Sequence, residues 1–416
     1  MRLCNKAFLL FVMISTFLVL SGVTESASAV EFVRGAALRQ NVIMFRLPSG
    51  MNRLIFPDKS FGISETRARL ISGVYSGNFV FNGAVDIRTG FMSSDMGLFG
   101  GSMGGGSLFG QGIPLERWDL TANHVEESTT SLLTRLDRLN IMWRHGSYDV
   151  IVGRQPVSLG TSHFVGILDV VAPFAPGDLD TTYKPGVDAV RVRRGVGMTG
   201  EAEIIVVGAR EWKNSALLGR FRSSFSGIDL EFIGGRFRDR SFSGFGWEGG
   251  AGSLGLWGEL ALFERKKAEE SWRGGWSEAA FSGIAGVDVS IADNTILGGA
   301  LMFQDFGVRR PEDLASVYTD APFREGWMFL GSASYGVMTL HRQLHPLVNG
   351  DLASLINLID GSTLWQPVIT ISTGDNTDLA LYGWIGTGEK SASGGSIRSE
   401  FGMMPDGGGF YARWFF

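Results

Sequence analysis

The sequence predicts an all-β protein, specifically a transmembrane antiparallel up-and-down β-barrel of about 18 strands. Three observations predict this fold class. The N-terminus has the features of an export signal, segments of about ten residues alternate between apolar and polar side chains, and the chain ends on an aromatic strand. Long stretches with the helical period of 3.6 residues, which an ordinary soluble enzyme of this length would show, are few.

The composition excludes several other classes of protein. The 416 residues include 59 glycines, and this share of glycine is about twice the usual ~7%. Only 19% of the residues are charged. A disordered chain would have fewer aromatic residues and a higher net charge. The single cysteine excludes a disulfide scaffold and a multi-cysteine metal site. The net charge of −5 gives no basic excess, so we expect no nucleic-acid partner.

Residues 1–29 have the pattern of a signal peptide. A positively charged start precedes an apolar run over residues 7–23, and the segment ends in the small-residue cleavage site Ala27-Ser28-Ala29. A retained membrane anchor is the alternative interpretation of the apolar run. We expect cleavage after Ala29, export of residues 30–416 as a single barrel domain, and loss of the only cysteine with the signal.

The mature chain alternates with a period of two residues, as half-buried strands do. In residues 279–291, Val287 and Val289 fall on one face of the predicted strand, whereas Asp288 and Ser290 fall on the other. A soluble β-sandwich shows the same alternation. The period therefore indicates β-structure but does not by itself distinguish a sandwich from a barrel.

The last strand favours the barrel. Phe410, Ala412, Trp414 and Phe416 share one face, and the chain ends on an aromatic residue. This pattern resembles the final strand of bacterial outer-membrane barrels, where the strand is the signal that the barrel-assembly machinery reads. The resemblance implies that these four residues are an insertion signal and that the protein lies in the cell outer membrane, in contact with its lipid.

Turn residues divide the mature chain into about 18 expected strands, with both ends on the periplasmic side. Short connections are expected near 75–78, 145–146, 195–199, 223–226, 251–253, 292–294 and 374–376, and the stretch 339–349 is the least typical of them. Sixteen strands are the alternative, if two short segments are loop hairpins. The expected strands are 33–46, 62–74, 79–91, 130–144, 147–155, 187–194, 200–208, 214–222, 227–235, 241–250, 254–264, 277–291, 295–306, 326–338, 350–359, 363–373, 377–387 and 408–416.

Two of the longer connections are distinctive. The 92–129 connection contains a Gly-rich run that does not follow a strand and open a helix, so it is not a nucleotide-binding loop. The 156–186 connection is rich in apolar residues that would not be stable in water, so we interpret it as a constriction loop that folds into the barrel. The alternative is an external cap that packs on neighbouring loops or binds a neighbouring molecule.

A barrel of this size leaves an aqueous channel unless loops fill it. We expect charged side chains at the pore wall and at the constriction, where clustered arginines would favour anionic solutes. In the alternative interpretation these arginines pair with carboxylates across the pore and only keep it hydrated. The candidates are Arg138, Arg154, Asp169, Asp178, Asp180, Lys184, Asp188, Arg191, Arg193, Arg220, Arg222 and Arg413.

Three short motifs carry a family resemblance. Residues 153–155 (Gly-Arg-Gln), 186–191 (Gly-Val-Asp-Ala-Val-Arg) and 399–402 (Ser-Glu-Phe-Gly) resemble the porin-like barrels of proteobacteria that include the alginate-export type. The resemblance covers about a quarter of the chain. It implies an 18-stranded outer-membrane channel for a polar or anionic solute. It also implies that Arg154, Asp188 and Arg191 are pore or loop-anchoring residues.

The sequence therefore predicts a passive outer-membrane channel for small polar or anionic solutes. We expect no cofactor. A homo-oligomer is compatible with the sequence, which shows no interface. One alternative is a loop-plugged barrel that acts as a surface receptor or polysaccharide-export partner. The other is a barrel-embedded hydrolase, which is disfavoured because adjacent Ser162 and His163 would point to opposite sides of an extended strand. His341 and His345 have no nearby carboxylate in sequence, so no metal site is predicted.

Overall fold

The structure is a computed structural model that describes residues 30–47, 60–93, 114–176, 181–266, 279–390 and 397–416. The predicted signal peptide and the Gly-rich run (97–112) lie outside these residues. None of the helices in the described ranges is long and apolar enough to span a membrane. The short helical segments are η2 (Trp212–Asn214), η3 (Pro311–Asp313), α3 (Leu314–Val317), α4 (Ala321–Arg324) and η4 (Phe401–Met403).

The fold is built from nineteen antiparallel strands in one sheet. They are β1 (Val30–Arg46), β2 (Ser60–Ser76), β3 (Phe79–Met92), β4 (Thr121–Glu126), β5 (Thr130–His145), β6 (Tyr148–Gln155), β7 (Val187–Val196), β8 (Gly200–Val207), β9 (Ala216–Phe225), β10 (Ile228–Phe237), β11 (Arg240–Ala251), β12 (Leu254–Glu264), β13 (Ala279–Ala292), β14 (Thr295–Gln304), β15 (Ser334–His345), β16 (Val348–Asn357), β17 (Thr363–Gly374), β18 (Thr377–Thr387) and β19 (Asp406–Phe415).

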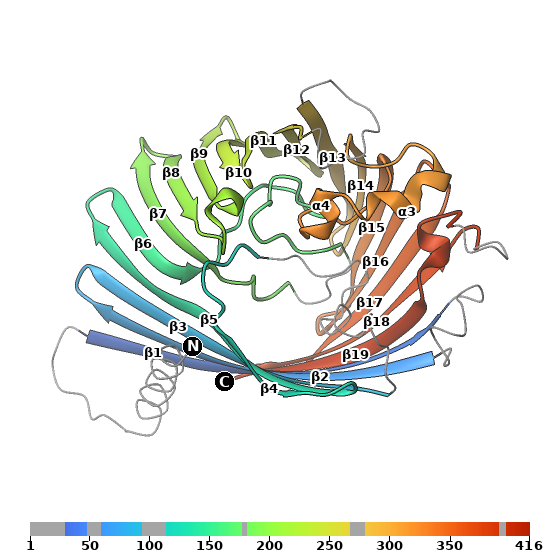
Figure 1. The fold of residues 1–416 in the computed structure, drawn as a ribbon, viewed down its shortest axis with the longest axis horizontal. Helices are drawn as coiled ribbons and strands as arrows, with labels where there is room; N and C mark the ends of the chain where they lie inside the picture. The colour runs from blue at the N-terminus through green and yellow to red at the C-terminus, as the bar shows by residue number, and fades with distance from the viewer. Residues whose placement is uncertain (1–29, 48–59, 94–113, 177–180, 267–278, 391–396) are drawn as a thin grey trace.

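The sheet closes into a barrel because β1 pairs with β2 on one edge and with β19 on the other (Figure 1). β4 is an addition to the ring, since it pairs with β5, beyond the part of β5 that pairs with β6. Nineteen strands less β4 leave eighteen, which confirms the predicted fold class and strand number. Closure pairs the backbone groups of the wall without leaving an open sheet edge.

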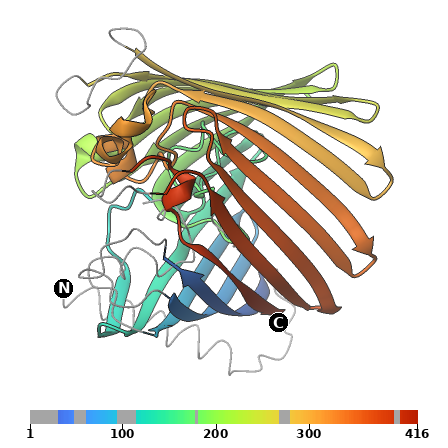
Figure 2. The same ribbon diagram turned by 90° about the vertical axis from the view of Figure 1, so that its right-hand side faces the viewer.

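The two ends of the barrel differ in the length of their connections (Figure 2). At the short-turn end, strands are joined by tight turns such as that between β2 and β3, where Gly77 adopts a φ of 57° that suits a two-residue hairpin. At the long-loop end lie α3 and α4, between β14 and β15, and the connection between β6 and β7, which passes into the ring (Figure 1).

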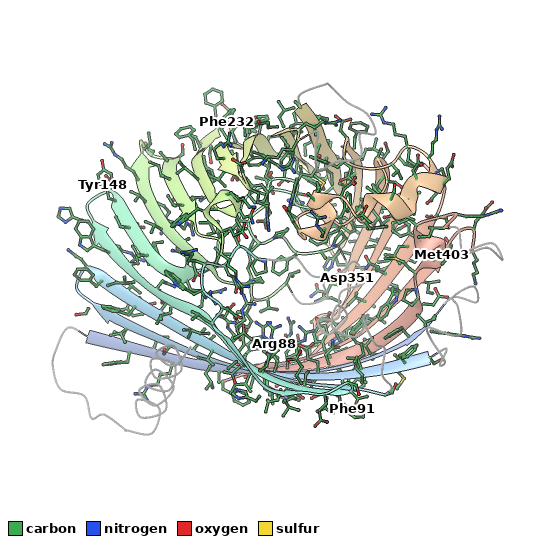
Figure 3. The ribbon with its side chains drawn as sticks, viewed as in Figure 1. Arg88, Phe91, Tyr148, Phe232, Asp351 and Met403 are labelled. Atoms are coloured by element: carbon green, nitrogen blue, oxygen red, sulfur yellow. The ribbon has the colours of Figure 1, made fainter. Side chains whose placement is uncertain are left out.

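Side chains alternate between an outward and a lumen face, as predicted. Figure 3 shows Phe91, Tyr148 and Phe232 on the outside of the ring, and Arg88 and Asp351 on the inside. The exposed fractions agree with this assignment, because the outward Phe91 and Phe232 are 56% and 49% exposed. An apolar belt around a polar interior is the pattern of a barrel that sits in lipid.

The predicted positions of two elements were wrong. The expected strand 326–338 is observed as β15 from Ser334, and residues 326–333 instead belong to the long connection with the short helices. The expected connection 339–349 is a two-residue turn between β15 and β16. β4 also lies where the sequence predicted only a loop.

Candidate functional site: the barrel lumen

The described residues of the 156–186 loop, 156–176 and 181–186, lie inside the barrel, and the first of these segments packs against one side of its inner wall. Val157, Leu168 and Val171 of this loop are fully buried in the same apolar cluster as inward residues of β8 to β14. On β11, the inward Gly244 and Gly246 leave space that the Leu168 side chain occupies. The described part of the loop therefore packs into the lumen, and its role as a constriction stays a prediction.

Glu259 of β12 anchors the middle of this loop. Its Oε1 accepts hydrogen bonds from the backbone N–H groups of Thr161 (2.6 Å) and Ser162 (2.7 Å), and its Oε2 accepts from those of Ile167 (2.6 Å) and Leu168 (3.0 Å). The side chain is fully buried. One carboxylate thus satisfies four backbone donors that would otherwise be buried without partners.

His163 fixes the same part of the loop to the lumen wall. Its Nδ1 lies 2.9 Å from Asp288 Oδ2 and its Nε2 lies 3.0 Å from Glu248 Oε1, and its ring packs on Trp257. The Ser162 hydroxyl accepts a hydrogen bond from the backbone N–H of Phe164 at 3.4 Å. Ser162 and His163 therefore do not form the hydrogen-bonded serine–histidine pair of a hydrolase.

An ion pair between Lys184 and Asp169 links the two arms of the loop. Burial raises the pKa of the Asp169 carboxyl to about 6, although the Lys184 ammonium acts in the opposite direction. The base of the loop is held by the neighbouring wall, because the Arg138 guanidinium donates to the Lys184 carbonyl and Gly186 N–H donates to Asp137 Oδ1.

Residues 181–183 of the loop reach the opposite wall. Arg413 of β19 donates to the Thr182 hydroxyl at 2.8 Å, and the guanidinium of Arg69 on β2 lies 4.4 Å from the centre of the Tyr183 ring. These contacts bound a cleft between the loop and the wall formed by β1, β2 and β19. Its lining includes Arg39, Arg67, Arg69, Thr182, Tyr183 and Arg413.

The arginines of this wall belong to a network of buried ion pairs. Asp86 of β3 pairs with Arg67 at 2.6 Å and with Arg69 at 2.9 Å, and Arg69 continues to Asp137 at 2.7 Å. Asp137 also pairs with Arg138 at 2.6 Å. Carboxylates thus hold the guanidinium groups in fixed positions on the lumen face.

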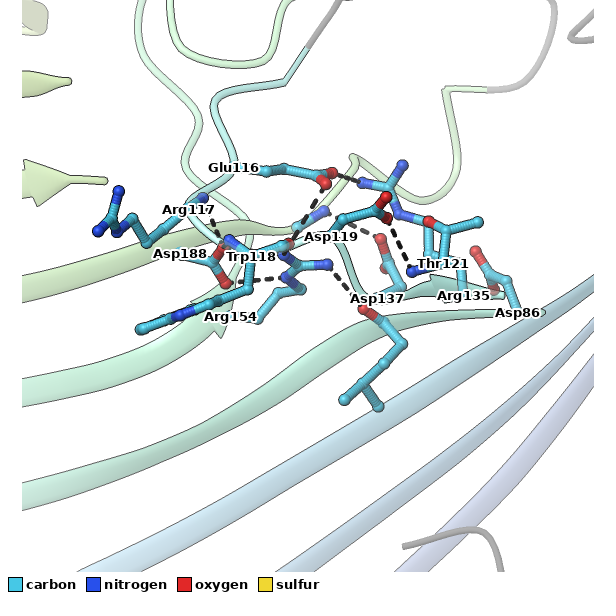
Figure 4. A network of polar contacts seen from close by, with 12 residues as sticks. Asp86, Glu116, Arg117, Trp118, Asp119, Thr121, Arg135, Asp137, Arg154 and Asp188 are labelled. Carbon is cyan, nitrogen blue, oxygen red and sulfur yellow. Dashed lines mark hydrogen bonds and ion pairs between the residues drawn. The ribbon is translucent and has the colours of Figure 1, made fainter. Parts of the chain in front are cut away.

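Arg154 and Asp188 hold a connection to the wall, which is one of the two roles, pore or loop anchor, that the resemblance implied. They are paired across β6 and β7 on the face that also carries the outward Val152 and Val190, yet both are buried. Residues 116–118 cover them: Asp188 Oδ2 accepts from Trp118 N–H at 3.1 Å, and Arg154 donates to the Trp118 carbonyl at 2.5 Å (Figure 4). The pair fastens one long connection to the wall, and its role at the pore stays a prediction.

The other predicted arginines face the lumen, and each has a carboxylate partner. Arg191 pairs with Glu203 at 2.6 Å, Arg193 with Asp149 at 2.9 Å, and Arg222 with Glu201 at 2.9 Å. Arg220 contacts Glu203 at 2.5 Å. Arg413 pairs with Asp378 at 3.2 Å. These pairs join neighbouring strands of the wall, whereas the alternative interpretation placed the partners across the pore. Asp178 and Asp180 lie outside the described residues.

The predicted insertion residues form one face of β19. Phe410 is 40% exposed, whereas Tyr411 on the other face is buried and stands beside Arg39. The two histidines of the 339–349 stretch lie in a strand, where His341 Nδ1 contacts Asp351 Oδ1 at 2.6 Å. No group of three or more metal-ligating side chains occurs in the part of the chain that the structure describes.

Sequence reasoning missed Glu259, Tyr183 and the arginines of β1 and β2. Glu259 could have been found, because it is a single charged residue on the inward face of an otherwise apolar strand, between Trp257 and Ala261 on that face. Arg67 and Arg69 could also have been placed by alternation. The position of Tyr183 depends on the path of the loop, which no local pattern indicates.

Comparison with solved structures supports the architecture. Pseudomonas aeruginosa OprD matches with a TM-score of 0.56 at 9% identity, covering 95% of this chain and 99% of that one. Acinetobacter baumannii OccAB4 matches with a TM-score of 0.55 at 11% identity (93% and 98%), and P. aeruginosa OccK5 with 0.54 at 10% (94% and 99%). No family model and no curated protein sequence matches the chain.

At this level of identity the likeness concerns the fold. The chain has the closed 18-stranded antiparallel barrel of outer-membrane porin structures. The finer resemblance to the alginate-export type is not shown by these comparisons.

Proposed function

We propose that this protein is an outer-membrane channel through which small polar or anionic solutes pass passively. The observation that carries the proposal is the cleft between the lumen loop and the β1–β2–β19 wall, which Arg39, Arg67, Arg69 and Arg413 line. Guanidinium groups held in a low-dielectric wall raise the local concentration of anions although the whole chain is negative. The outward apolar belt and the similar porin structures support the membrane location.

Reversal potentials in planar bilayers under a salt gradient test this proposal. Arg39→Gln should reduce the preference for anions, because it removes a positive charge from the cleft. The matched control is Arg194→Gln, which removes the same charge from an outward side chain that packs on Tyr148. Equal reversal potentials for the two variants would contradict the role of the cleft, and a purified barrel without conductance would contradict the channel.

A second candidate function is a loop-closed barrel that serves as a surface receptor or a polysaccharide-export partner. It is favoured by the contact of Thr182 with Arg413, through which the loop reaches across the lumen. The conductance measurement separates the candidates, because a closed barrel gives folded protein in the membrane without single-channel events.

We also propose that the outward face of β19 is the signal for the barrel-assembly machinery. Phe410, Ala412, Trp414 and Phe416 support this as the apolar face of the closing strand. Phe416→Ala should lower the amount of heat-modifiable, folded barrel in the outer membrane. Phe415→Ala, on the other face of the same strand, is the control, and an equal effect of both changes would contradict the proposal.

A further inference from the structure

The outward surface of β1, β2 and β3 carries polar side chains in the middle of the strands. Gln40, Ser64, Thr66 and Thr89 lie on the same parity as exposed apolar residues of their own strands, namely Met44 (68% exposed), Leu70 (47%) and Phe91 (56%). We call these four residues the outer polar row. The lumen face of the same strands carries the arginine network instead.

The outer polar row is continuous across the strands. Gln40 stands directly opposite Thr66, and Thr66 stands opposite Thr89. The Gln40 amide donates to the Ser64 hydroxyl at 2.9 Å and accepts from the Thr66 hydroxyl at 2.5 Å. Side chains from three neighbouring strands therefore present one hydrogen-bonding surface.

Apolar and small residues surround this row. On the outward face of β1, Gln40 lies between Leu38 and Met44, and on β2 Thr66 is followed by Ala68 and Leu70. The row thus lies inside the apolar belt and not at its edge. Ala68, next to Thr66 on this face, is a small residue of the kind found at contacts between membrane-spanning segments.

A strand on the opposite side of the barrel does not repeat the row. β12 lies nine strands from β2 in either direction around the ring of eighteen. Its outward residues Leu256, Leu260 and Leu262 are apolar and between 39% and 55% exposed. β12 therefore gives an apolar outward surface with which the row can be compared.

Polar groups that face hydrocarbon lose the hydrogen bonds that water would give them. Amide and hydroxyl groups each donate and accept hydrogen bonds, so one copy of this surface can pair with another copy. The row carries no charge, so two copies do not repel each other. We propose that the outer polar row is a contact between two copies of this chain in the membrane. This inference rests on the proposed membrane location.

Cysteine cross-linking tests the contact. In a Cys4→Ser background the chain has no other thiol, so Thr66→Cys places a single reactive group in the row. A short bis-maleimide added to membranes should give a product of twice the chain mass with Thr66→Cys. Leu260→Cys, on the opposite wall, is the matched control and should give several-fold less of this product.

A second variant tests the chemistry of the contact. Gln40→Leu with Thr66→Val keeps the size of the side chains and removes their hydrogen bonding, so the oligomer should dissociate in detergent while single-barrel conductance stays unchanged. Equal cross-linking of Thr66→Cys and Leu260→Cys, or a product whose mass indicates another protein, would overturn the inference. If the protein were a monomeric barrel that still conducts, the contact between copies would be overturned while the proposed function would stand. If the protein were absent from the outer membrane, the proposed function would be overturned.

Discussion

Replacing Glu259 by glutamine should release the lumen loop without unfolding the barrel. The carboxylate accepts four backbone hydrogen bonds from residues 161–168, two on each oxygen. The amide of glutamine keeps one oxygen and replaces the other with an NH₂ group, which cannot accept. Two backbone N–H groups then lose their acceptor and face the amide hydrogens.

The size of the effect follows from these two lost bonds. A hydrogen bond to a charged group contributes roughly 1.5–3 kcal/mol, so two of them amount to about 3–6 kcal/mol. Each 1.4 kcal/mol changes an equilibrium by about tenfold. The ratio of docked to released loop should therefore fall by roughly two orders of magnitude or more. The wall should be little affected, because its backbone bonds do not involve this side chain.

Two measurements report the release. Single-channel conductance should increase, because the loop no longer fills one side of the lumen, and proteinase K should cut within residues 156–186 of the intact barrel. Glu264→Gln, on the same strand, is the matched control, since Glu264 bonds to Ser241 and not to the loop. Equal conductance and equal protease resistance of the two variants would refute the anchoring role.

Three further outcomes are expected. Arg154→Ala should destabilise the barrel by about 3–5 kcal/mol in urea titrations, because it leaves buried Asp188 without its ion-pair partner, and a loss below about 1 kcal/mol would contradict this. The pKa of Asp169 is raised from 3.8 to about 6, so its contribution to loop docking is complete below pH 3.8 and is lost as the pH rises through 6. Protection of the loop from protease should therefore decrease over this pH range, and Asp169→Asn should make the protection less dependent on pH. Tyr183→Ala should widen the cleft and raise conductance, whereas Tyr183→Phe should not; equal conductance of the two would exclude the ring as a barrier.

The strands could be predicted because alternation is a local property. It failed at β15, where His341, Arg342 and Gln343 suggested a solvated connection. Two of these side chains face the lumen, while Leu340 and Leu344 keep the outward apolar pattern. The apolar residues 327–330 were interpreted as a strand instead, although they belong to the long connection that contains α3 and α4, and Trp327 and Leu330 pack into the core cluster.

Partners of the charged residues could not be predicted from one sequence, because they depend on strand register. Arg191 was expected in the lumen, but its pairing with Glu203 requires the offset between β7 and β8. Arg154 shows a second limit. Its parity is outward, yet residues 116–118 from another connection cover it and give it acceptors. Burial of a side chain by a segment that is distant in sequence cannot be predicted from the alternation of its own strand.

The three parts of the lumen loop are held with different strength, and in the proposed channel this difference would decide where solute passage is controlled. The base is fixed by Asp137 and the middle by Glu259, both through hydrogen bonds to a carboxylate. Residues 181–183 are held by the hydroxyl contact of Thr182 with Arg413 and by the Tyr183 ring on Arg69. One charge-assisted hydrogen bond and a ring contact are weaker than the four charge-assisted hydrogen bonds of Glu259. In the proposed channel, a solute that displaces residues 181–183 would therefore meet a smaller barrier than one that displaces the middle of the loop.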